Sequence, residues 1–245
     1  MMGAALEALG LRWRYLRLPV EPALFAETVL ALPGSGYRGA NVTIPHKPAA
    51  LRVATRATPA AAAIGAANTL TFDADGAIEA DNTDAGGFLD ALGEPPAGLR
   101  ALVLGAGGAG RAVAWALREA GAAQVMLWNR TAERAAALAT ELQVEHVERP
   151  QRADLIVNAT AVGLQTGAEE STALSDLGLD GLEPPAVAVD LVYGSEPTPF
   201  AGWAARGGAR VVDGLDVLVA QGARSLERWT GRAAPLDVMR TAASI

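Results

Sequence analysis

The stretch Leu102-Val103-Leu104-Gly105-Ala106-Gly107-Gly108-Ala109-Gly110 is the part of the chain that decides the fold. Its apolar beginning is typical of a buried strand, and residues 111–119 have the pattern of a helix. Glycines in the pattern G-x-G-x-x-G allow a tight turn and let backbone N–H groups approach a pyrophosphate at the helix N-terminus. A glycine-rich turn that binds nothing is the alternative, but the strand–turn–helix context favours a dinucleotide site over residues 105–110.

Short apolar strands alternate with amphipathic helices around and after this stretch. The predicted strands span residues 102–104, 125–128, 155–157, 187–191 and 210–212. Such alternation predicts a parallel sheet with crossover helices, which is a Rossmann-type doubly wound α/β domain. From Gly214 to the end the chain is again helical.

The first part of the chain has a different pattern of predicted helices and strands. We predict helices over 3–10, from Pro45-His46-Lys47-Pro48 onward, over 58–65 and over 85–92. Strands are expected over 13–20 and 38–43, and a hairpin joins 68–72 to 77–80 around Asp73-Ala74-Asp75-Gly76. The segment from Gly93 to Gly98 is the best candidate for a linker between domains. We therefore expect an α/β domain over 1–97 and the dinucleotide-binding domain over 98–213. C-terminal helices over 214–245 are expected to return to the first domain.

Composition excludes several classes of protein. The chain has 245 residues, 51% of them hydrophobic, and a net charge of −7, which argues against a nucleic-acid partner. It contains no cysteine, and its two histidines are far apart, so we expect no metal site. No targeting signal and no membrane-spanning run is present, which makes a cytoplasmic protein with no membrane partner the expected case.

The turn after the second strand of the dinucleotide domain indicates which cofactor binds. An NAD site usually has an acidic residue there, on the ribose hydroxyls, but this chain has Asn129-Arg130-Thr131. Arg130, with Arg134 one helical turn later, can hold a 2′-phosphate through charge-assisted hydrogen bonds. If both arginines are merely solvated, this argument fails. We therefore expect NADP rather than NAD.

Two features of the amino-acid composition point to a polar site. Of the 20 basic residues only Lys47 is a lysine, and a buried amine can lose its proton whereas a guanidinium does not. The chain has five asparagines, and each lies beside a threonine or one residue away from one. Such pairs are common in turns, so a local structural role and a polar pocket are both open at this point.

Taken together, the motifs of this chain resemble those of the shikimate dehydrogenase family. They occur in the family's order over nearly the whole chain, and the ordered set is far more specific than any one motif. The matches are Asn41-Val-Thr43-Ile-Pro45-His-Lys47, Gly65-Ala-Ala-Asn68-Thr69, Asp81-Asn82-Thr83-Asp84, Gly105-Ala-Gly-Gly108, Asn129-Arg130-Thr131, Asn158-Ala-Thr160, Asp190-Leu-Val-Tyr193, Thr198-Pro199 and Gly214-Leu-Asp-Val-Leu218-Val-Ala-Gln221.

The resemblance implies an enzyme that reversibly reduces 3-dehydroshikimate to shikimate with NADPH, a step of chorismate and aromatic amino-acid biosynthesis. It implies a cleft between the two domains, with Lys47 as the acid/base group and Asp84 sharing its proton network. A nearby carboxylate favours the charged lysine and desolvation favours the neutral amine, and the sequence leaves both open.

The resemblance also implies the binding residues. Thr43, Asn68, Tyr193 and Gln221 would hold the substrate's hydroxyls and carboxylate. Thr160 and Gly214 would join residues 105–110, Asn129, Arg130, Thr131 and Arg134 at the cofactor. Taken singly, these residues have structural alternatives: Asp84 as a helix cap, Asn68 as a turn residue, Tyr193 in the core and Gln221 in solvent. The family contains monomers and dimers, so a homodimer stays open.

The chain departs from the family pattern at its beginning. The family starts with a strand and a loop bearing Ser-x-Ser, together roughly 20 residues, which have no counterpart here. We expect an unpaired sheet edge or an exposed apolar face, and hypothesise that Met1 is an internal methionine. A relative that prefers quinate or NAD, and a nucleotide-binding module with impaired catalysis, are the alternative functions.

Overall fold

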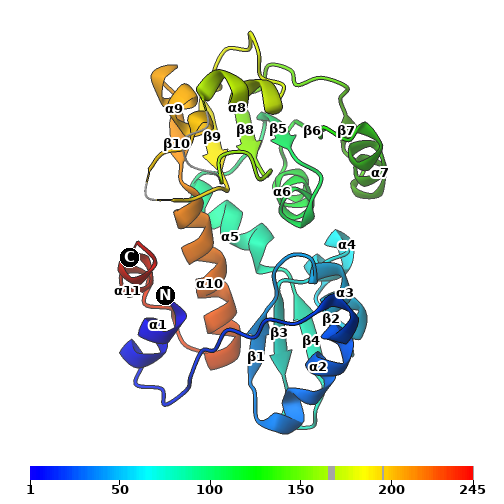
Figure 1. The fold of residues 1–245 in the computed structure, drawn as a ribbon, viewed down its shortest axis with the longest axis vertical. Helices are drawn as coiled ribbons and strands as arrows, with labels where there is room; N and C mark the ends of the chain where they lie inside the picture. The colour runs from blue at the N-terminus through cyan, green and yellow to red at the C-terminus, as the bar shows by residue number, and fades with distance from the viewer. Residues whose placement is uncertain (165–168, 195, 245) are drawn as a thin grey trace. The chain divides into compact units, whose positions relative to one another are not determined.

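The computed structural model describes residues 1–164, 169–194 and 196–244 and separates into two compact units (Figure 1). One unit comprises Met1–Gly87 with Val219–Ile245, and the other comprises Phe88–Leu218. The chain passes from one unit to the other inside two helices, α5 (Thr83–Leu92) and α10 (Gly214–Thr230). From the sequence, we predicted domain limits between residues 97 and 98 and between residues 213 and 214. The functional roles of these domains stay a prediction.

The Phe88–Leu218 unit holds, among its described residues, a six-stranded parallel sheet in the order β10-β9-β8-β5-β6-β7. The strands are β5 (Arg100–Leu104), β6 (Gln124–Trp128), β7 (Glu145–His146), β8 (Leu155–Asn158), β9 (Val187–Asp190) and β10 (Arg210–Val212). Along the chain lie also α6 (Gly108–Glu119), α7 (Ala132–Leu142), α8 (Glu170–Asp176) and α9 (Pro199–Arg206). Because the winding direction changes between β5 and β8, the sheet is doubly wound and the predicted α/β class is confirmed.

The central strands of this sheet are buried along their length. Leu102, Leu104, Leu127 and Val157 have no exposed surface. Burying a leucine or valine side chain contributes roughly 1.5–3 kcal/mol, so this layer is a main source of the unit's stability. It also explains why the strands are continuous apolar runs, as expected for parallel strands that have helices on both faces.

The other unit contains a smaller mixed sheet, with the order β1-β3-β4-β2 over the residues that the structure describes. The strands are β1 (Gly39–Asn41), β2 (Arg56–Ala57), β3 (Thr69–Phe72) and β4 (Ile78–Asp81). The predicted hairpin is confirmed: β3 and β4 are antiparallel, with Thr69 opposite Asp81. This register brings the residue before β3 next to the residues after β4.

Helices cover this sheet and form a second core beside it. They are α1 (Met2–Ala8), α2 (Phe25–Ala31), α3 (Lys47–Val53), α4 (Pro59–Ile64), α11 (Leu236–Ala243) and the two 3-10 turns η1 (Pro22–Leu24) and η2 (Pro33–Ser35). Met2 and Leu6 of α1 pack with Leu226 of α10 and Met239 of α11 in one buried cluster. The C-terminal helices therefore belong, from Val219 onward, to the same compact unit as the N-terminal helix. None of the described helices is long and apolar enough to span a membrane.

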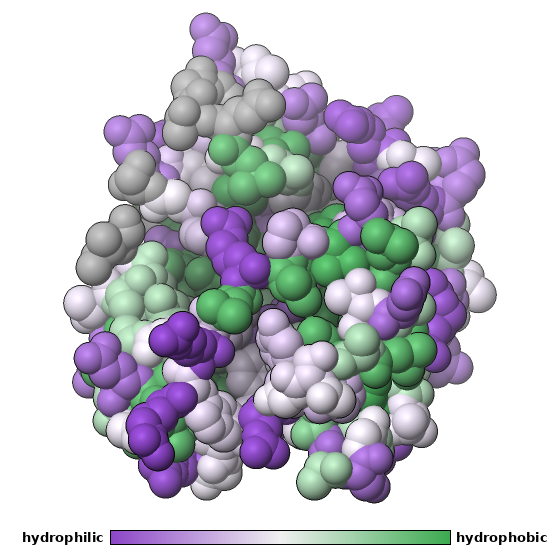
Figure 2. Space-filling model, turned by 60° about the horizontal axis from the view of Figure 1, so that its bottom comes forward, coloured by the Kyte–Doolittle hydropathy of each residue, from purple (hydrophilic) through white to green (hydrophobic). Residues whose placement is uncertain are grey.

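The strand predicted over residues 13–20 is wrong. This segment has no regular secondary structure, and β1 forms an edge of the sheet as far as the structure describes it. An apolar alternation becomes a strand only if a neighbour accepts its backbone hydrogen bonds, and here the described contact is a side-chain one, from Tyr15 Oη to Asn41 Oδ1 (3.0 Å). Trp13, Leu16 and Leu18 remain exposed, and Figure 2 shows apolar groups lying at the surface among strongly hydrophilic ones.

A buried carboxylate ties together the ends of two sheet strands. Asp190, the last residue of β9, is 2% exposed and accepts hydrogen bonds from Asn158 Nδ2 (2.9 Å), Val192 N (3.0 Å) and the Thr198 hydroxyl. Asn158 ends β8, and its Oδ1 accepts from the backbone N and hydroxyl of Thr160 at 3.1 and 2.7 Å. Asp190 thereby holds the turn after β8 at the carboxyl edge of the sheet, where ligands of doubly wound folds bind.

We expect the charge of Asp190 to make stability depend on pH. Burial raises the pKa of Asp190 to about 6 from its ordinary 3.8, although the three hydrogen bonds act to lower it. The charge of Asp213 makes a smaller contribution that also raises this pKa. Between pH 4 and 6 the native state therefore binds more protons than the unfolded state, and stability falls as pH rises through this window. A rise in pKa of this size corresponds to roughly 3 kcal/mol.

The measurement is urea unfolding of the protein and of Asp190→Asn, which cannot titrate, at several pH values. The stability of the parent relative to the variant should decline from pH 4 to pH 7, by up to about 3 kcal/mol. A difference that stays constant over this range would contradict the raised pKa.

Candidate active site

The only lysine of the chain forms a close ion pair. Lys47 begins α3 and Asp84 lies in the first turn of α5, and Lys47 Nζ is 2.6 Å from Asp84 Oδ2. The side chains are 13% and 19% exposed, so the pair is largely shielded but still open to a ligand. Removing one partner would leave a partly desolvated charge without its counter-ion, which is costly.

The local fold explains why these two residues meet. The backbone O of Lys47 accepts a hydrogen bond from Ala67 N at 2.9 Å, which ties the start of α3 to the residues just before β3. Asn68 N donates to Asp81 O at 3.1 Å, and Asn68 O accepts from Val42 N at 2.7 Å. The hairpin therefore holds Asn68 between Lys47 and the first turn of α5.

Asn68 is buried beside the pair, and its amide has a defined orientation. The backbone N–H of Thr83 can only donate, and it lies 2.7 Å from the Asn68 atom that must therefore be the oxygen, Oδ1. Asn68 Nδ2 then faces Asp84 Oδ1 at 2.7 Å and Gln221 Oε1 at 3.3 Å. One oxygen of Asp84 thus accepts from Lys47 and the other from Asn68.

The structure brings four of the six predicted catalytic and substrate residues into one cluster: Lys47, Asp84, Asn68 and Gln221. Thr43 is exposed in the turn that precedes α3, where its backbone O accepts from His46 N. Tyr193 belongs to the other compact unit, in the segment after β9, and is half exposed. A titratable amine held by a carboxylate, which is itself held by the Asn68 amide, can exchange a proton with a hydroxyl or carbonyl placed against it.

Three polar residues of this cluster were not assigned a role from the sequence. Thr69, Thr83 and Ser225 are all buried, and their hydroxyl groups lie within 3.1 Å of one another behind Asn68. Thr69 and Thr83 fall inside the motifs quoted above. The signal for Ser225 is its spacing: it follows Gln221 by four residues on α10, and residues four apart share a helix face.

The predicted dinucleotide loop has the geometry that its three glycines require. Gly105 follows β5 with φ +111°, and a Cβ there would lie 2.8 Å from Ala159 O. A Cβ on Gly110 would lie 1.9 Å from Gly105 O, so the third glycine lets α6 pack against the turn. A Cβ on Gly107, the N-cap of α6, would meet nothing within 4 Å. The helix N-terminus is therefore open to an anion.

Side chains from the neighbouring strand ends support this loop. Asn129 Oδ1 accepts from Ala106 N at 3.2 Å, and Asn129 Nδ2 donates to Thr131 O at 3.0 Å. Asn129 therefore joins the glycine loop to the turn after β6. A Cβ on Gly105 would also lie 3.1 Å from Thr160 Cγ2, so Thr160 borders the same turn.

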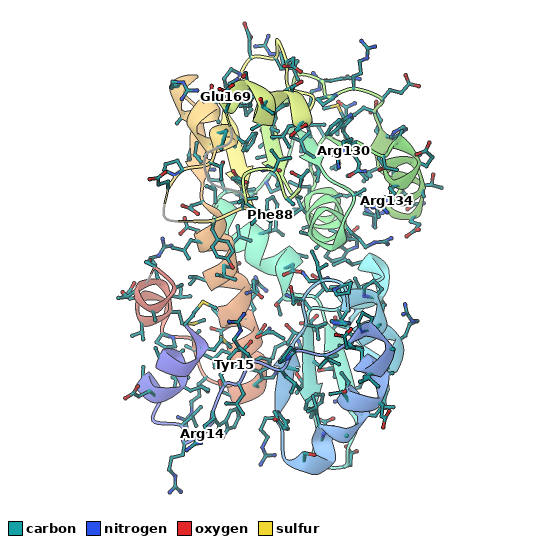
Figure 3. The ribbon with its side chains drawn as sticks, in the orientation of Figure 1. Arg14, Tyr15, Phe88, Arg130, Arg134 and Glu169 are labelled. Carbon is teal, nitrogen blue, oxygen red and sulfur yellow. The ribbon has the colours of Figure 1, made fainter. Side chains whose placement is uncertain are left out.

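Two arginines lie at the beginning of α7, as Figure 3 labels them. Arg130 precedes the helix, Arg134 lies in its first turns, and both are exposed. Gly214 begins α10, where a Cβ would lie 2.7 Å from Asp190 O, so its glycine permits a close approach of backbone to backbone. The open helix N-terminus and the two exposed guanidinium groups fit a phosphorylated dinucleotide.

Comparisons with known proteins agree along the chain. The family models "Shikimate dehydrogenase substrate binding domain", "Shikimate / quinate 5-dehydrogenase" and "Shikimate 5'-dehydrogenase C-terminal domain" match residues 1–70, 93–176 and 214–243. A shikimate dehydrogenase (NADP(+)) of Moorella thermoacetica is 41% identical, over 98% of this chain and 85% of that protein. The corresponding protein of Geobacter metallireducens is 40% identical, over 98% of this chain and 88% of that protein.

A solved structure has the same fold. It is a shikimate 5-dehydrogenase from Thermus thermophilus in complex with NADP(H) and shikimate. The two share 40% sequence identity with a TM-score of 0.85, over 99% of this chain and 91% of that one.

Proposed function

The chain belongs to the shikimate dehydrogenase family, and we propose that it interconverts shikimate and 3-dehydroshikimate with NADP through Lys47 and Asp84. The observation that carries the assignment of these two residues is the 2.6 Å contact between Lys47 Nζ and Asp84 Oδ2, beside the oriented amide of Asn68. The family supports the reaction, and this geometry supports the roles of the residues.

The reaction needs a group that moves a proton. Oxidation of the secondary alcohol removes a hydride from carbon and a proton from the hydroxyl oxygen, and leaves a ketone. NADP⁺, when bound, supplies the hydride acceptor. In this direction Lys47 Nζ acts as a neutral amine and takes the hydroxyl proton, and in the reverse direction the ammonium returns it to the ketone oxygen. Asp84 keeps Nζ in place and stabilises the ammonium as it forms.

The remaining predicted residues bind the substrate and the cofactor in this proposal. Thr43, Asn68, Tyr193 and Gln221 supply hydrogen bonds to the ring hydroxyls and carboxylate. Residues 105–110 hold the pyrophosphate at the N-terminus of α6.

Two arginines select the cofactor in the same proposal. Arg130 and Arg134 hold the 2′-phosphate that distinguishes NADP from NAD. Support for this assignment comes from their exposure at the start of α7 and from the absence of an acidic residue in Asn129-Arg130-Thr131.

Lys47→Ala should abolish most of the turnover without changing cofactor binding. Positioned acid–base groups typically contribute about 100-fold to 10,000-fold in rate, so kcat should fall by this order. The measurement is absorbance of reduced nicotinamide with shikimate and NADP⁺, together with NADPH affinity by fluorescence titration.

Lys47→Arg provides the control for charge in this experiment, because it keeps a cation that does not release its proton. It should be as inactive as Lys47→Ala. Substantial turnover in either variant would rule out the role of Lys47 as the proton carrier.

Arg130→Ala combined with Arg134→Ala should weaken NADP⁺ use selectively. Hydrogen bonds to charged groups contribute about 1.5–3 kcal/mol, so KM for NADP⁺ should rise about 10-fold to 100-fold while KM for NAD⁺ changes little. Arg210→Ala is the matched control, because Arg210 is exposed at the amino end of β10, the opposite edge of the sheet. An equal effect on both cofactors would contradict recognition of the 2′-phosphate.

A further inference from the structure

We propose that Ser225 on α10 is a positioning residue of the active site: it holds Thr69 and Thr83 in place, and Thr83 in turn holds the Asn68 amide against Asp84. The inference rests on the proposed roles of Lys47 and Asp84. It adds a residue that the sequence did not single out and that does not itself contact the ion pair.

Ser225 is fully buried at the centre of a group of hydroxyls. Its Oγ lies 2.8 Å from Thr69 Oγ1 and 3.1 Å from Thr83 Oγ1. It also donates to the backbone O of Gln221 at 3.0 Å and accepts from Asn41 Nδ2 at 2.9 Å. The serine therefore joins α10 to β1, β3 and the start of α5.

The donors and acceptors determine what Ser225 must do. A hydroxyl has one proton, and in the proposed arrangement Ser225 donates it to the backbone carbonyl of Gln221, as serines within helices commonly do with the carbonyl four residues earlier. Towards Thr69 and Thr83, Ser225 can then only accept. One threonine donates to Ser225, and the other is free to donate to Asn68 Oδ1, which lies 3.1 Å from both hydroxyls.

Removing the Ser225 oxygen would leave this arrangement short of an acceptor. A threonine hydroxyl would lose its acceptor in a buried place, where an unsatisfied donor is costly. Asn41 Nδ2 would lose its contact of 2.9 Å and keep only the longer one of 3.4 Å to Thr69 Oγ1. The threonine hydroxyls would then compete for Asn68 Oδ1 or shift to find another acceptor. Thr83 directly precedes Asp84, so a shift of Thr83 displaces the carboxylate together with the Asn68 amide.

The chain offers a matched control on the same helix. Thr230 is also on α10, and its hydroxyl donates to the backbone carbonyl four residues earlier, Leu226 O, at 2.8 Å. Its other described partners are backbone groups of Arg232. Thr230→Ala therefore removes the same kind of helix-internal bond without touching the Asn68 network.

The test compares Ser225→Ala, Thr230→Ala and the parent protein in kcat, KM and side-chain amide NMR. A misplacement of about 1 Å can cost on the order of 100-fold in rate, so Ser225→Ala should lower kcat about 10-fold to 100-fold while KM for NADP⁺ is unchanged. Thr230→Ala should retain parental kcat. Equal kcat in Ser225→Ala and the parent would overturn the proposal.

A pair of substitutions at Thr83 separates positioning from general destabilisation. Thr83→Ser keeps the hydroxyl and should retain most of kcat, whereas Thr83→Val keeps the shape, removes the hydroxyl and should resemble Ser225→Ala. If both Thr83 variants lose kcat equally, a packing role explains the loss and the proposal is overturned. In an Asp84→Asn background, Ser225→Ala should have no further effect, because both act on one group.

The NMR readout keeps this inference distinct from the proposed function. The Asn68 side-chain NH₂ resonances, assigned through Asn68→Asp, should move and lose protection from exchange in Ser225→Ala but not in Thr230→Ala. Absence of turnover in the parent protein would overturn the proposed function. Unchanged Asn68 resonances in Ser225→Ala would overturn only the role of Ser225.

Discussion

The hydrogen bond from Thr83 N to Asn68 Oδ1, at 2.7 Å, is the interaction on which the cluster around Lys47 and Asp84 depends. A backbone N–H can only donate, so this bond determines which end of the Asn68 amide faces Asp84. It forms because β3 and β4 pair in a register that places the residue before one strand next to the residues after the other. The register of the β3–β4 hairpin therefore helps to determine where the atoms of the ion pair lie.

The Phe88–Leu218 unit depends on close backbone approach in a comparable way. At Gly105 and Gly110 a side chain would collide with neighbouring backbone, whereas at Gly107 the space is open. Two of the three glycines are therefore needed for close packing of the backbone, and the third leaves room for a ligand. Asn129 and the Asp190–Asn158 pair then hold the adjoining turns by side-chain hydrogen bonds. These polar contacts give the loops a defined shape at the sheet edge where strands end.

Most of the elements, but not all of them, could be predicted from local pattern. The buried strands of the large sheet are continuous apolar runs with turn residues at their ends, and the β3–β4 hairpin has a clear turn signal, so both were predicted correctly. The strand over residues 13–20 was wrong because alternation reports which side chains are apolar and says nothing of a pairing partner. Ser225 was missed for a related reason: its spacing from Gln221 shows that the two share a helix face, but nothing local shows that two distant threonines approach it.

The sequence by itself determined the family, the doubly wound sheet, the glycine loop and the identity of the acid/base candidates, because these follow from residue order, spacing and residue type. The tertiary structure alone decided which candidates share a site and how each amide is turned. Lys47, Asn68, Asp84 and Gln221 are separated by up to 174 residues, and only folding brings their polar atoms within hydrogen-bond distance. Hydrogen bonds act over about 3 Å, so such contacts depend on the positions of whole helices and strands, which local sequence does not encode.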